Sequence, residues 1–189
     1  MKKLGLLLLL VCAVAGTAFA QAAGDNSVYF TTYFSNANVS GAPDATVRVI
    51  NDGDTGGSLY AAYYVFDDSQ ELTECGACYI SPDGINSESV NKNLTANPLT
   101  GRFIHVGGIK LISSASSDAR SVTPRAGLRP WGTHIQAAGA KTWAVTETKF
   151  ADSNLVAAEQ TMLQNLCYYA IILGSGTGTI TCTPEDHDF

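Results

Sequence analysis

The stretch that decides the fold is SLYAAYYVF, residues 58–66. Both of its alternating sets of side chains are apolar or aromatic, which is typical of a strand that is buried on both faces. It is flanked by NDGDTGG at residues 51–57 and by DDSQ at residues 67–70, whose Asn, Asp and Gly residues favour tight turns. The sequence therefore predicts a central strand of a β-sheet, with a reversal of the chain at each end.

Further short segments predict strands because they are rich in β-branched and aromatic residues or alternate apolar with polar ones. They are residues 27–34 (SVYFTTYF), 45–50, 72–80, 108–113, 133–137, 141–150 and 179–182. Residues 85–103 predict weak strands at most, and residues 114–131, with their Pro and Gly, form the longest predicted loop. Strands and helices do not alternate, so the expected fold is mainly β, an antiparallel two-sheet (Ig-like) β-sandwich.

Residues 154–173 break this pattern, because apolar or small side chains recur there at spacings of three and four. Such spacing predicts an amphipathic helix near the C-terminus, closing one edge or end of the sandwich. The face expected to pack consists of Leu155, Ala158, Met162, Leu166, Tyr169 and Leu173, and the opposite face of Thr161, Gln164, Asn165 and Tyr168. Cys167 is expected toward the packed side, beside Leu163 and Ala170, and Gly174 suits the end of the helix.

The N-terminus has the three parts of a secretory signal peptide, residues 1–20. Lys2 and Lys3 precede an apolar stretch, and Ala18-Phe19-Ala20 forms a small-residue cleavage site. We expect export to the medium or the cell surface, with the periplasm as the alternative, and no membrane insertion after cleavage. Residues 21–182 are expected to form a single β-sandwich domain, and residues 183–189 a flexible acidic tail.

The charge balance limits the partners. Without the two signal-peptide lysines, nine basic residues stand against 17 acidic ones, a net charge of −8. Nucleic acid and anionic membranes bind basic patches, so neither is expected as a partner. Charged residues make up 15% of the chain, against about 25% in an average soluble protein. This composition is typical of extracellular β-proteins and of subunits that bury surface in an assembly.

Four cysteines follow the signal peptide: Cys75, Cys78, Cys167 and Cys182. An even number in an exported chain predicts two disulfides, with three alternative pairings. The Cys-x-x-Cys spacing is also found in redox and zinc sites, but no helix pattern begins there and export disfavours free thiolates. We favour bonds that join Cys75 and Cys78 to Cys167 and Cys182, and a local Cys75–Cys78 bond stays open.

No catalytic, cofactor or metal-binding residue is predicted. Four aspartates, Asp52, Asp54, Asp67 and Asp68, are better explained as turn residues than as calcium ligands. The glycine-rich residues 174–178 follow a helix, whereas a phosphate loop precedes one. The three histidines form no motif, and no Gly-x-Ser-x-Gly elbow is present. Among the aromatic residues, Trp131 in its predicted Pro/Gly loop is the one most expected to be exposed, as a binding residue.

Several stretches resemble a family of small exported, cysteine-containing proteins, chiefly from acidobacteria, whose function is uncharacterised. They are residues 64–67 (YVFD), 70–72 (QEL) leading into Cys75-x-x-Cys78, 93–100 (NLTANPLT), 146–150 (TETKF) and Leu166-Cys167 with the later GSG at 174–176. Family members carry additional cysteines where this chain has Gly76 and residues 178–181. The resemblance implies export and disulfides, and it transfers no activity and no catalytic residue.

These observations favour an exported, non-enzymatic structural or adhesion-type β-sandwich protein, a candidate self-assembling surface or filament subunit. Residues 27–34 are the candidate for pairing with a neighbour's sheet edge by strand addition, although a role as the domain's own first strand is the simpler expectation. The alternative function is a monomeric extracellular module that binds a carbohydrate or small ligand through exposed aromatic residues. An exported thiol oxidoreductase or hydrolase is less favoured. The expected partner is therefore a second copy or an extracellular polysaccharide.

Overall fold

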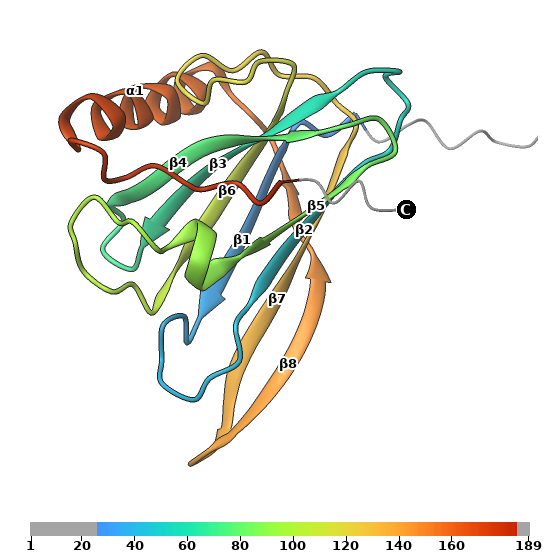
Figure 1. Cartoon of the computed structure of the whole chain (residues 1–189). Helices are drawn as coiled ribbons and strands as arrows, with labels where there is room; N and C mark the ends of the chain where they lie inside the picture. The colour runs from blue at the N-terminus through green and yellow to red at the C-terminus, as the bar shows by residue number, and fades with distance from the viewer. Residues whose placement is uncertain (1–25, 185–189) are drawn as a thin grey trace, which may run out of the picture.

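The computed structural model describes residues 26–184; the predicted signal peptide and residues 185–189 lie outside this range. Within it, the chain forms two antiparallel sheets and one α-helix near the C-terminus (Figure 1). This confirms the predicted mainly β, two-sheet sandwich with a C-terminal helix. The elements are β1 (Tyr29–Ser35), β2 (Thr46–Asn51), β3 (Leu59–Asp67), β4 (Leu72–Ile80), β5 (Ile85–Ser89), the π-helical turn η1 (Val90–Leu94), β6 (Val106–Ser114), β7 (Leu128–Gly139), β8 (Thr142–Lys149), β9 (Ala151–Ser153) and α1 (Ala157–Leu173).

The apolar strand β3 is buried on both faces, as its sequence predicts. It lies between β4 and β6 in a five-stranded sheet of order β4-β3-β6-β1-β9, and the facing sheet has the order β5-β2-β7-β8. Ala61, Tyr63 and Val65 belong to the core between the two sheets. Ala62 and Tyr64 belong to a second core, which α1 covers. The second layer explains why both alternating sets of β3 are apolar.

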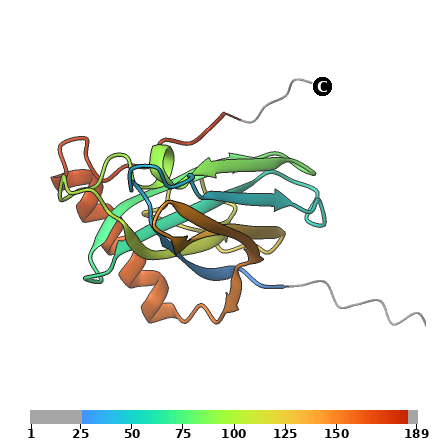
Figure 2. The same cartoon turned by 90° about the horizontal axis from the view of Figure 1, so that it is seen from below.

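The helix α1 packs on the outer side of the five-stranded sheet, away from β2 and β5 (Figure 2). Its buried residues are Leu163, Cys167 and Ala170, as expected for the side that carries Cys167. Of the predicted packing face, Leu155 and Leu166 are partly buried against the same core. The prediction is wrong for Met162, Tyr169 and Leu173, which are 41%, 59% and 72% exposed. The helix is apolar around most of its circumference, so its periodicity does not single out one face. The disulfide that joins Cys167 to Cys75 of β4 fixes the side that is buried.

The structure corrects two predictions, the loop over residues 114–131 and the strand over residues 179–182. The predicted loop over residues 114–131 is wrong at its end, because β7 begins at Leu128 and Trp131 lies within this strand. Pro130 signalled a loop, but it lies in β7 opposite Val49 of β2, and its carbonyl accepts a hydrogen bond from the Phe150 N–H. Residues 179–182 form no strand: Thr179 makes an isolated parallel bridge to Cys75.

The segment of residues 178–183, here named the C-terminal segment, runs along the side of the sandwich where β4 and β5 lie (Figure 1). The Cys75 N–H donates to the Gly178 carbonyl at 2.9 Å, and the Ile180 N–H donates to the Cys75 carbonyl at 3.1 Å. Ile180 is buried in the core between the sheets. The segment therefore closes this side of the sandwich. Residues 185–189 of the predicted acidic tail lie outside the described part of the chain.

The first predicted strand pairs within its own domain. β1 is antiparallel to β6 over all seven of its residues, from the pair Tyr29–Ile112 to the pair Ser35–Val106. On its other side, residues 29–31 pair with β9. Phe30 and Phe34 are buried in the core. β1 is thus an internal strand, in agreement with the simpler of the two expectations for residues 27–34.

Two adjacent glycines of β6 provide a test of this packing. A methyl group at Gly107 would lie 2.0 Å from the Phe66 carbonyl oxygen and 2.7 Å from the Phe34 ring, whereas one at Gly108 would meet nothing nearer than 3.7 Å. Gly107→Ala is expected to lower the free energy of unfolding by about 1–3 kcal/mol, because the backbone must shift. Gly108→Ala is the control and should leave it unchanged or raise it by about 0.5 kcal/mol. Urea denaturation of both variants measures the difference.

Candidate functional site

The four cysteines form two disulfides, Cys75–Cys167 and Cys78–Cys182, which close loops of 92 and 104 residues. Both bonds match the favoured partnership of the Cys-x-x-Cys pair with the two later cysteines. Three positions apart on a strand, Cys75 and Cys78 point to opposite faces of β4, so the local bond left open by the sequence is not formed. Cys75 lies under α1, and Cys78 lies in the core between the sheets. Two disulfides indicate an oxidising environment.

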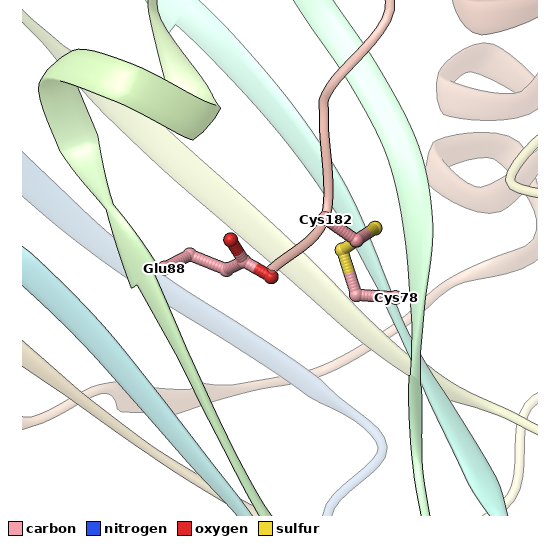
Figure 3. Close-up of side chains that lie close together, drawn as sticks. All are labelled: Cys78, Glu88 and Cys182. Carbon is pink, nitrogen blue, oxygen red and sulfur yellow. A yellow bond between two sulfur atoms is a disulfide. The ribbon is translucent and has the colours of Figure 1, made fainter. Parts of the chain in front are cut away.

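Glu88 of β5 lies beside the Cys78–Cys182 disulfide, and Figure 3 shows these three side chains. Its carboxylate accepts hydrogen bonds from the Thr183 N–H at 3.0 Å and from the Thr183 hydroxyl at 2.9 Å. Burial raises the pKa of Glu88, while the hydrogen bonds from Thr183 oppose that shift. These hydrogen bonds fix the C-terminal segment at Thr183. Thr183 lies one residue beyond Cys182, where the sequence predicts the domain to end.

This cluster has the composition of a metal site, because one ligand atom each of Cys78, Glu88 and Cys182 lies within 4.8 Å of the others. A metal ion binds cysteine as a thiolate. Here the two sulfur atoms are bonded to each other at 2.05 Å, so they do not fit a metal ion. The arrangement instead fastens the C-terminal segment to β4 through the disulfide and to β5 through Glu88.

A second buried carboxyl group, that of Glu74 in β4, was not found from the sequence, where Glu74 is the one charged residue of a mostly apolar strand. Its Oε1 accepts a hydrogen bond from the Asn97 N–H at 2.7 Å. Its Oε2 is buried without a hydrogen-bond partner. Burial raises the pKa of Glu74 to about 7, and the bond from Asn97 opposes this shift. Glu74 therefore carries an ionisable group whose charge is costly in the folded protein.

The other sequence candidates are structural within residues 26–184. Asp52 and Asp67 accept hydrogen bonds from backbone N–H groups two residues ahead, which confirms the assignment of these aspartates to turns. The His134 Nε2 lies 2.7 Å from the Thr148 hydroxyl, and no carboxylate of the described residues is hydrogen-bonded to its Nδ1. A hydrolytic triad requires a carboxylate at this nitrogen. The His105 Nδ1 lies 2.7 Å from the Ala37 carbonyl, and His187 lies outside the described residues.

Two grooves flank α1. One, of about 430 Å³, lies between the helix, the middle of β1 and β6 and the end of β3, with Phe66, Lys110 and Met162 in its wall. The other, of about 490 Å³, lies on the far side of Leu166 and includes Tyr169 and Leu173. The Lys110 ammonium pairs with Glu159 at 2.6 Å, and Glu159 also accepts a hydrogen bond from Tyr29. This pairing neutralises the one cationic group among the described residues in the lining of the first groove, which also includes Asp67.

Trp131 lies on the outer side of the four-stranded sheet. In β7 the residues Leu128, Pro130 and Gly132 are buried, and the alternating residues, Trp131 among them, are partly exposed. Trp131 is directly opposite Arg48 of β2 and Lys149 of β8. A hollow of about 230 Å³ on this surface is lined by Arg48, Ile50, Ile85, Trp131 and Glu147. We call this surface, together with Arg129 and Lys149, the Trp131 face.

The outer edge of β8 is the long strand edge that no described segment covers. β8 has eight residues and pairs only with β7, at the end of its sheet. All of its residues except Trp143 are exposed, including Val145 at 55%. The β7–β8 hairpin extends past the other strands (Figure 1). A row of backbone N–H and C=O groups along this edge is therefore accessible to another strand.

Comparison with known proteins gives no family. No family model and no curated protein matches the sequence. Among solved structures, the crystal structure of Thermotoga maritima 1070 aligns with 68% of this chain and 94% of that chain, with 12% sequence identity and a TM-score of 0.44. A likeness this distant assigns neither fold nor function. No helix in residues 26–184 is long and apolar enough to cross a membrane.

The raised pKa of Glu74 predicts a dependence of stability on pH. A folded pKa near 7, above the unfolded value of 4.5, means that the folded protein binds this proton more tightly. Glu74 should therefore lower the free energy of unfolding progressively from about pH 4.5 to pH 7, by up to about 3 kcal/mol. In Glu74→Gln this part of the pH dependence should be absent. Urea denaturation at several pH values compares the two proteins, and equal slopes would contradict the prediction.

Proposed function

We propose that this protein is an exported, non-enzymatic structural subunit of the cell surface or extracellular matrix, which pairs with a second copy through β8. The uncovered edge of β8 is the observation that carries the proposal. The predicted signal peptide supports export, and the two disulfides support an oxidising destination. The low content of charged residues is typical of subunits that bury surface in an assembly.

The other three sheet edges support this assignment by contrast. Proteins protect sheet edges by covering them or keeping them short. The edge of β4 carries the Cys75–Thr179 bridge. Beside β5, Asn86 and Glu88 hold Thr183 by hydrogen bonds. β9 has only three residues. Since β8 is long and uncovered, association with another strand is the function that explains its difference from these edges.

The sequence of β8 favours a strand partner. Its first five residues, Thr142 to Thr146, carry no charge and include two threonines, a valine and a tryptophan, which suit a strand. Two copies related by a twofold axis present β8 to each other antiparallel, which joins their four-stranded sheets into one. Such an interface closes on itself and gives a dimer. β1 is not needed as the donor, because it is occupied by β6 and β9.

Proline substitution tests the proposal. Alternate residues of an edge strand direct their N–H outward, so one of Ala144→Pro and Val145→Pro removes an outward donor and leaves the β7–β8 pairing intact. A twofold interface contains each substitution twice. The proline variant that lacks an outward N–H should therefore raise the dimer dissociation constant at least about tenfold. Sedimentation velocity of the oxidised mature protein across a concentration series measures it, and near-UV circular dichroism verifies the fold.

The exposed apolar side of α1 supplies the matched control. Tyr169→Ser changes a residue that is 59% exposed and far from β8 in sequence, and it should leave the dimer intact. If the wild-type protein is monomeric at every concentration, the proposal is wrong. It is equally wrong if Tyr169→Ser dissociates the dimer while neither folded proline variant does.

A further inference from the structure

The Trp131 face gathers a third of the basic side chains of this acidic mature chain. The mature sequence has nine Lys and Arg residues, and Arg48, Arg129 and Lys149 all lie on this face. Arg48 and Lys149 are the direct cross-strand neighbours of Trp131, and Arg129 precedes it by two positions on the same strand. The basic residues therefore surround one partly exposed indole ring.

Each of these cations has a carboxylate partner. Arg48 pairs with Glu147 at 2.6 Å, and Arg129 pairs with Asp52 at 2.5 Å. Lys149 lies 3.3 Å from Asp152. Three positive and three negative groups thus balance, and the face presents hydrogen-bond donors and acceptors side by side without net charge. This pattern disfavours a charged polymer, whose charges would meet repulsion from half of these groups.

The remaining surface of the hollow is apolar. The Trp131 ring lies there with Ile50 and Ile85, and Ile85 is 51% exposed. The hollow of about 230 Å³ is smaller than the roughly 300–1,000 Å³ of a site that encloses a small ligand. A ligand that lies across an open sheet face and places one ring at a time on the indole fits this shape.

We propose that the Trp131 face binds a neutral polysaccharide. A pyranose ring has an apolar C–H surface, which stacks on an indole, and peripheral hydroxyls, which both donate and accept hydrogen bonds. The hydroxyls of a ring on Trp131 meet the guanidinium of Arg48 and the carboxylate of Glu147 at the rim of the hollow. Ile50 and Ile85 extend the apolar surface beneath the neighbouring sugar unit.

This binding site does not depend on the proposed dimer, although the dimer would strengthen it. A twofold axis through a β8–β8 pair is perpendicular to the joined sheet, so both Trp131 faces lie on the same side. One polymer could then contact both faces, and its apparent affinity would rise through effective concentration. A monomeric proline variant should still bind, more weakly, which separates failure of the dimer from failure of the site.

Affinity electrophoresis of the oxidised mature protein tests the proposal. The gels contain dextran, laminarin or galactomannan as neutral polymers, or alginate as the anionic comparison. At least one neutral polymer should retard the wild-type protein, and alginate should not. Trp131→Ala should weaken this retardation at least tenfold, and Ile85→Asp, at an exposed position, should do so without a change in the core. Tyr79→Ala is the control, since Tyr79 is 45% exposed on β4, outside this face.

Three outcomes would overturn the assignment. The first is a wild-type protein that none of the neutral polymers retards. The second is stronger retardation by alginate than by every neutral polymer, which would assign the face to an anionic ligand. The third is a folded Ile85→Asp or Trp131→Ala variant that binds as well as Tyr79→Ala.

Discussion

The odd spacing of Cys75 and Cys78 on β4 is the constraint on which the rest of the structure depends. Because neighbouring positions of a strand alternate between faces, two cysteines three residues apart cannot serve the same side of the sheet. Cys75 ties α1 to the outer face, and Cys78 ties the C-terminal segment to the inner face. β4 thus anchors both α1 and the C-terminal segment, which follow it in the chain.

The C-terminal segment extends this constraint to the edges of the sandwich. Ile180 fills the core beside Gly76, where a side chain on β4 would come within 3.1 Å of it. Glu88 and the Cys75 backbone fix the segment from the two sheets. The side formed by β4 and β5 is closed in this way, and the opposite side of the four-stranded sheet, at β8, is not. The asymmetry separates a protected side from one that is free for interaction.

Sequence reasoning worked where a local pattern has one structural solution. The two apolar sets of residues 58–66 require burial on both faces, and β3 has it. It failed where the pattern has several solutions. The helix is apolar on more than one side, so Tyr169 and Leu173 fitted the predicted packing face although they are exposed. Pro130 predicts a loop by its chemistry, yet it lies within β7 opposite Val49 of β2. Glu74 and Glu88 carry no sequence signal, because their burial arises from segments about 20 and 95 residues away.

The sequence by itself determined the fold class, the central strand, the helix near the C-terminus and the number of disulfides, and it favoured bonds from the Cys-x-x-Cys pair to the two later cysteines. These follow from periodicity, turn residues and cysteine number, which are local properties of the chain. The tertiary structure alone decided which cysteine pairs with which, which apolar side chains of α1 stay exposed, which sheet edge stays open and which charges surround Trp131. Each of these depends on strand order and register, which bring distant residues such as Arg48, Trp131 and Lys149 into one row. No local pattern encodes such an arrangement, because it results from the packing of the whole chain.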